Sequence, residues 1–209
     1  MLGQTMNNYL FLDYFKDAKA LALVNVISVA GVLVLAPFVS KIASDFGKKE
    51  IGALGMLLSA IVYLALFFLR VKSIPVFMVL FFLGTIGVGI FNLIIWAFIT
   101  DIIDYQEVKT GKREDGTVYA IYSFARKLGQ ALAGGLGGFV LTAIGYISDA
   151  PAQTDVVADR IYSVATLVPG ICFFVVFLLM QFVYPLSKRE VEHNTALLLE
   201  KRRQEQERR

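Results

Sequence analysis

The sequence predicts an all-α, polytopic membrane protein with about five transmembrane helices. Of its 209 residues, 57% are hydrophobic and 18% are charged, and the mean hydropathy is +0.66. A soluble domain carries more charge and is only about half apolar. Long apolar runs account for the excess, and each is long enough to cross a bilayer, which takes about 20 residues. These runs lie roughly at residues 18–44, 51–71, 75–104, 117–147 and 160–185.

The two ends of the chain differ from the apolar runs. The first segment is too short and too polar to span a bilayer, because Gln4, Asn7 and Asp13 interrupt it. It has no basic stretch followed by an apolar core, so we do not expect a signal peptide here. We therefore expect the extracytoplasmic end of a truncated helix at 1–17, a transmembrane bundle at 18–186 and a charged cytoplasmic tail at 187–209.

The distribution of basic residues predicts the orientation of the helices. Three lysines lie at or near the connection 44–50, three basic residues lie in 105–116, and seven lie in the tail after Leu186. The alternate connections hold at most two each. Because Lys and Arg are enriched in cytoplasmic loops, we expect both of these connections and the C-terminus in the cytoplasm.

Two carboxylates close the apolar run at 75–104. Asp101 and Asp104 are three residues apart, which puts them on one face of a helix near its inner end. Arg113 lies a short loop away and could pair with both, as an inner gate whose salt bridges break on opening. The alternative is an ordinary charged helix end that headgroups solvate.

A second stripe on the same run steps by four through Asn92, Trp96 and Thr100. This stripe could line a cavity, in which Trp96 would stack on the apolar face of a sugar. The alternative is that the tryptophan only packs against neighbouring helices. Asn92 and Trp96 are therefore candidate residues of a substrate path.

The next run carries the cations Arg126 and Lys127 near its middle. Lys127 lies about ten residues, or about 15 Å, inward from Thr117, which places it near the bilayer midplane. Charges at this depth are costly and usually functional. Lys127 could donate hydrogen bonds to sugar hydroxyls or compete with a coupling cation for a carboxylate. The alternative is a fixed ion pair between helices, which is a weak source of stability.

Polar and aromatic residues extend this cationic region along one side of the helix. Ser123, Lys127 and Gln130 share one face, and Tyr122 and Arg126 lie on the adjoining stripe. One side of the helix is thus polar at the depth where secondary transporters bind substrate.

Glycines in two of the runs predict close contacts between helices. Gly134 and Gly138 form a small-xxx-small pair, which allows two helix backbones to approach. Gly84 and Gly87 either do the same or give their helix room to bend.

The connection at 44–49 (SDFGKK) places an acid before a glycine turn and lysines after it. It resembles the cytoplasmic signature of the major facilitator superfamily, in which the acid and the bases latch neighbouring helix ends. That resemblance assigns Asp45 and Lys48 to the cytoplasmic gate.

A longer pattern resembles one family within this superfamily. Residues 96–116 (WAFITDIIDYQEVKTGKREDG), 123–129 (SFARKLG) and Gly145-Tyr146 are similar, in this order, to the glycoside–pentoside–hexuronide:cation symporters. Melibiose permease is a well-known member. The resemblance covers the five runs, which would correspond to helices 8–12 of a twelve-helix transporter, its C-terminal half. It implies alternating-access symport of a sugar or glycoside with Na⁺ or H⁺ across a bacterial cytoplasmic membrane.

The resemblance also implies roles for individual residues. Asp101, Asp104 and Arg113 fall on inner-gate charges. Lys127 falls on a lysine linked to the cation and sugar sites, with Ser123 and Tyr122 as its cavity-facing neighbours.

Two departures from the family pattern matter. Asn92 stands where melibiose permease has a sugar-side tryptophan. The family's cation-binding acids belong to the first six helices, so we expect the main cation site in an N-terminal half, as a required partner. No other cofactor is implied.

Other function classes are less well supported. The sequence shows no nucleophile–base set and no metal-ligand spacing, so we do not expect an enzyme. Glutamates interleave the basic residues of the tail, so lipid headgroups rather than nucleic acid are the expected neighbours. The alternative to transport is a non-transporting membrane fragment, or an assembly or sensor partner.

Overall fold

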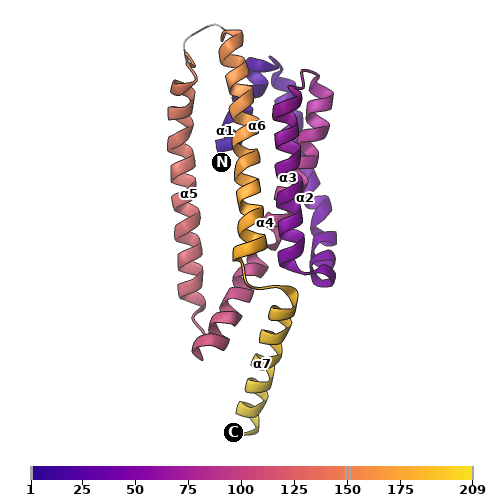
Figure 1. Ribbon diagram of the computed structural model, residues 1–209, viewed down its shortest axis with the longest axis vertical. Helices are drawn as coiled ribbons and strands as arrows, with labels where there is room; N and C mark the ends of the chain where they lie inside the picture. The colour runs from indigo at the N-terminus through magenta and orange to yellow at the C-terminus, as the bar shows by residue number, and fades with distance from the viewer. Residues whose placement is uncertain (1, 149, 151, 209) are drawn as a thin grey trace.

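The computed structural model describes residues 2–148, 150 and 152–208. This part of the chain is helical and contains no strand (Figure 1). Five helices are long and apolar enough to cross a membrane, α6 continuing into η2, which confirms an all-α, polytopic fold. The elements are α1 (Leu2–Tyr9), η1 (Leu10–Tyr14), α2 (Ala18–Phe46), α3 (Lys48–Leu69), α4 (Ile74–Thr110), α5 (Asp115–Ala143), α6 (Asp155–Leu178), η2 (Leu179–Val183) and α7 (Lys188–Glu207).

Local signals set the helix boundaries. The Asp17 carboxylate caps α2 by accepting hydrogen bonds from the amides of Lys19 and Ala20. Gly47, with φ of +103°, is the only residue between α2 and α3, and Gly111, with φ of +74°, ends α4. α4 therefore continues past the predicted end of its apolar run and carries its acidic residues on a regular helix.

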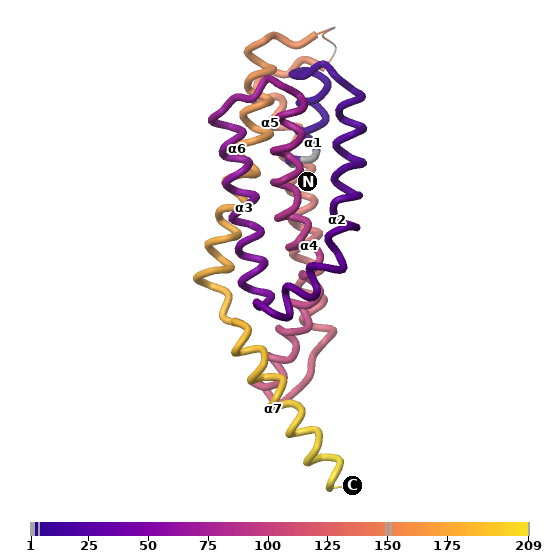
Figure 2. Tube along the Cα trace, turned by 90° about the vertical axis from the view of Figure 1, so that its right-hand side faces the viewer, coloured from indigo at the N-terminus to yellow at the C-terminus, as the bar shows by residue number. Residues whose placement is uncertain are grey.

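The first segment is more deeply buried than its polar composition suggests. Met6, Leu10 and Phe11 are 0% exposed and belong to the larger core cluster. Tyr162 of α6 is also fully buried, and its hydroxyl donates to the Leu66 carbonyl at 2.8 Å and accepts from the Val71 amide at 3.0 Å. The core thus lies toward the end of the bundle where α1, η1 and the α3–α4 connection meet (Figure 2).

Small residues bring α3 and α4 into close contact. A Cβ on Gly87 would collide with the carbonyl oxygen of Gly55. One turn away on each helix, the Ser59 hydroxyl donates to the Gly84 carbonyl at 2.7 Å. The predicted close packing through Gly84 and Gly87 is confirmed.

α5 stands apart from the other helices over its middle part (Figure 1). A Cβ added to Gly129, Gly134, Gly135 or Gly138 would meet no atom within 4 Å, whereas Gly137 is buried. The close packing expected at Gly134 and Gly138 is therefore not made by the part of the chain that the structure describes.

We predict that Gly87→Ala destabilises the bundle and that Gly134→Ala does not. The added methyl group at position 87 meets backbone atoms of α3, and such overpacking costs about 1–3 kcal/mol. The readout is the thermal unfolding midpoint of the purified chain in detergent. Equal midpoints for the two variants would contradict the close contact between α3 and α4.

Candidate functional site

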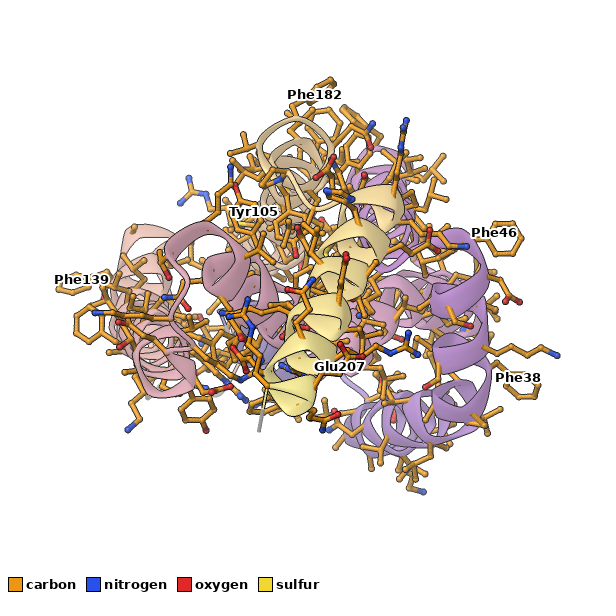
Figure 3. The ribbon with its side chains drawn as sticks, turned by 90° about the horizontal axis from the view of Figure 1, so that it is seen from below. Phe38, Phe46, Tyr105, Phe139, Phe182 and Glu207 are labelled. Carbon is orange, nitrogen blue, oxygen red and sulfur yellow. The ribbon has the colours of Figure 1, made fainter. Side chains whose placement is uncertain are left out.

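Many of the basic residues lie at one end of the bundle, which we call the basic end. It consists of the α2–α3 junction at Gly47, the connection at 111–114 and α7. Seen from below, α7 lies across this end (Figure 3). Three carboxylates of α4 face these elements: Asp101, Asp104 and Glu107.

Lys48 and Asp101 form a close ion pair between α3 and α4. The Lys48 Nζ and Asp101 Oδ1 atoms are 2.6 Å apart, and the Asp101 side chain is only 6% exposed. The sequence-based pairing of Asp101 with Arg113 is wrong. Because Gly47 alone separates α2 from α3, Lys48 starts α3 beside the end of α4 and reaches this carboxylate first.

Arg113 lies in the connection between α4 and α5 and contacts three carboxylates. Its Nη1 lies 2.9 Å from Asp104 Oδ1 and 3.0 Å from Glu107 Oε2, and its Nη2 lies 3.0 Å from Asp115 Oδ1. These hydrogen bonds, led by the one to Asp104, raise the pKa of Arg113 above its ordinary value. The guanidinium therefore joins the end of α4 to the start of α5.

The three carboxylates of α4 and their cationic partners form a charged layer, and α7 is fixed to this layer. Arg202 Nη2 lies 3.6 Å from Glu107 Oε2, so this carboxylate contacts cations from two elements. Lys188 Nζ donates to the Asp45 carbonyl at 2.9 Å. Within the described residues, the Asp45 carboxylate forms no ion pair, so its predicted latch is made by its backbone instead.

The connection into α7 is held by a second lysine. Lys49 Nζ donates to the carbonyl of Tyr184 at 2.7 Å. The two lysines after Gly47 therefore have different partners, one on α4 and one just after η2.

An aromatic contact joins α4 to α5 beside the charged layer. The Trp96 ring stacks on Tyr119, with centroids 6.1 Å apart and planes at 19°, and meets Tyr122 edge-on at 5.8 Å. Trp96 is 51% exposed and Tyr119 is 50% exposed, so both rings also present surface away from each other.

The remaining predicted path residues are not brought together by this chain. Arg126, Lys127 and Asn92 are exposed, and Ser123 and Gln130 are half-buried. Among the described residues, none of these five side chains has a hydrogen-bond or ion-pair partner. The polar face of α5 is therefore uncovered.

Sequence reasoning missed three residues of the layer, namely Glu107, Tyr184 and Arg202. Glu107 continues the three-residue spacing of the two aspartates, which could have identified it. Nothing in the sequence indicates that Arg202, far along α7, would reach this carboxylate.

The fold and the charged layer together define a helical, multi-pass membrane protein with a polar face on one of its long helices. The family model for MFS/sugar transport proteins matches residues 1–188, and the chain belongs to this family.

Curated relatives agree with this assignment. The chain is 35% identical over 168 residues to the glucuronide carrier protein homolog of Escherichia coli, covering 80% of this chain and 36% of the relative. It is 33% identical over 174 residues to an uncharacterised symporter, YjmB, of Bacillus subtilis, covering 83% and 38%. A putative sulfoquinovose importer of Escherichia coli is 33% identical over 175 residues, covering 83% and 37%. The chain thus spans little more than a third of the length of these relatives.

We predict that Lys48→Met destabilises the chain by about 1–3 kcal/mol, because it leaves the buried Asp101 carboxylate without a cation. The value is below that for a fully buried pair, since the Lys48 side chain is 32% exposed. Unfolding of the purified chain in detergent measures the effect, and Lys41→Met, at an exposed lysine, is the matched control. The double variant Lys48→Met/Asp101→Leu should recover part of the loss; no recovery would contradict the account.

Proposed function

We propose that the chain forms the C-terminal half of a secondary active transporter for a sugar or glycoside. The observation that carries this proposal is the uncovered polar face of α5, with Arg126 and Lys127 at mid-helix, in a member of a sugar-transport family. A cation in the middle of a membrane span needs a partner or water. Helices outside this chain, in an N-terminal half, would complete that site.

The charged layer at the basic end acts as the gate on one side of the membrane. Arg113 holds the start of α5 to the end of α4 through Asp104 and Glu107. In alternating access these pairs break when the basic end opens, and Lys48–Asp101 loosens with them. Partly exposed ion pairs suit such a role, because each stabilises the closed arrangement only modestly, whereas the buried Asp101 carboxylate is costly to leave unpaired. The basic end then faces the cytoplasm, following the positive-inside bias.

The relatives suggest the substrate class. A glucuronide carries a carboxylate and sulfoquinovose carries a sulfonate, and relatives are named for carrying each. We therefore propose a sugar or glycoside with an anionic group as the substrate. Transport is coupled to Na⁺ or H⁺, whose main site lies among acids of the other half, and Lys127 competes with the cation for one of those carboxylates.

The second candidate is a non-transporting membrane protein, such as an assembly or sensor partner. The uncovered middle of α5 favours it, because a surface of that kind can receive another protein.

Sugar counterflow in vesicles distinguishes the two candidates. Vesicles would hold this chain alone, a matching N-terminal half alone, or both together, with a labelled glucuronide outside and an unlabelled one inside. Exchange only with both halves supports the transporter. No exchange in any vesicle, although both halves are inserted and associated, would favour the non-transporting protein, and ion-driven uptake by this chain alone would show that the other half is not needed.

We predict that Lys127→Ala in the reassembled transporter lowers ion-driven uptake by about tenfold or more, as expected for loss of one charge-assisted hydrogen bond. Protein level and thermal midpoint should stay near wild type, because the side chain is exposed and unpaired among the described residues. Wild-type uptake and affinity would instead give Lys127 no part in coupling.

A further inference from the structure

The helical register of α5 separates the two neighbouring cations. Arg126 lies seven residues after Tyr119 and eleven before the buried Gly137, and both separations are within about 20° of whole turns. Ile144, just past α5, is buried and lies five full turns from Arg126. Arg126 is therefore on the side of α5 that faces this bundle, and Lys127 lies about 100° around the helix.

Among the described residues, no acid is placed to pair with Arg126 at that depth. Residues 51–100 and 116–147 contain neither Asp nor Glu, and the Arg126 side chain has no ion pair among the described residues. An unpaired guanidinium inside a membrane span is costly, and two oxygens of a carboxylate or a sulfonate can accept hydrogen bonds from its fork of donors. The bundle-facing cation thus lacks an anion that a ligand could supply.

An aromatic surface lies one to two turns along the same side of α5. Tyr119 and Tyr122 both contact Trp96 of α4, and half of the Trp96 surface remains exposed. Exposed aromatic faces offer apolar contact to the C–H face of a sugar ring. Arg126 follows Tyr122 by one turn, about 6 Å along the helix axis, which is comparable with the size of one hexose unit.

We propose that Trp96, Tyr119 and Tyr122 form a platform for the sugar ring and that Arg126 binds its anionic group. This inference rests on the proposed function and assigns its substrate selectivity to one residue. Lys127, on a different side of α5, is left for coupling with the other half. The ligand class is a pyranose with a carboxylate or sulfonate, held by a bidentate contact to the guanidinium.

Trp96 is the single tryptophan of the chain, so its fluorescence reports directly on this platform. The probes are methyl β-D-glucuronide and methyl β-D-glucoside, which differ at C6 only, titrated into the full chain in lipid nanodiscs. The glucuronide should shift the Trp96 emission at concentrations about 10- to 100-fold lower than the glucoside, the range for a hydrogen-bonded charge. Arg126→Gln should remove this difference, Arg126→Lys should keep part of it, and Lys41→Gln, at an exposed lysine elsewhere, should leave it unchanged.

A remaining response of Arg126→Gln to the glucoside shows that the variant is folded. Equal responses to both glycosides in the wild-type chain, an unchanged preference in Arg126→Gln, or loss of preference in Lys127→Gln only, would overturn the assignment of Arg126. Absence of any emission change would overturn the platform. None of these results determines whether the two halves exchange sugar in the counterflow experiment. Failure of this inference can therefore be distinguished from failure of the proposed function.

Discussion

The three carboxylates at the end of α4 are the groups on which the basic end depends. Asp101 binds α3 through Lys48, Asp104 binds the start of α5 through Arg113, and Glu107 binds both Arg113 and α7 through Arg202. One side of a single helix thus fixes three others. The cations between these three like charges offset their mutual repulsion, so the positions of α3, α5 and α7 are coupled through electrostatics.

This arrangement suits a gate better than a permanent bundle contact. The larger core cluster holds α1, η1, α2, α3, α4 and α6 together through apolar packing, which under the proposed function stays intact when the ion pairs break. α5 instead joins α4 through Arg113 and the Trp96 contact at one end and reaches the core near Ile144 at the other. A helix fixed at its ends and open in the middle can present its polar face to a substrate between two bundles.

Much of the fold follows from the sequence, because hydropathy alone determines which segments can enter a membrane. The close α3–α4 contact through Gly87 follows only in part, since the sequence left helix bending as an alternative there, and Gly134 and Gly138 make no such contact among the described residues. The ion-pair partners of individual side chains cannot be predicted from the sequence. The choice of Lys48 for Asp101 depends on Gly47 being the only residue between two helices, and the reach of Arg202 to Glu107 depends on the angle of α7. Lys127 has no side-chain partner among the described residues, so its role remains a prediction.

Arg113 holds the start of α5 against the bundle through Asp104 and Asp115. Spin labels on Ser44→Cys and Gly116→Cys, with the exposed Cys172 replaced by Ser, would measure the distance between the basic ends of α2 and α5 by pulsed electron resonance. Arg113→Gln should lengthen or broaden this distance distribution, while Lys112→Gln, at a neighbouring exposed lysine, should leave it as in the parent. An unchanged distribution in Arg113→Gln would contradict this role of Arg113.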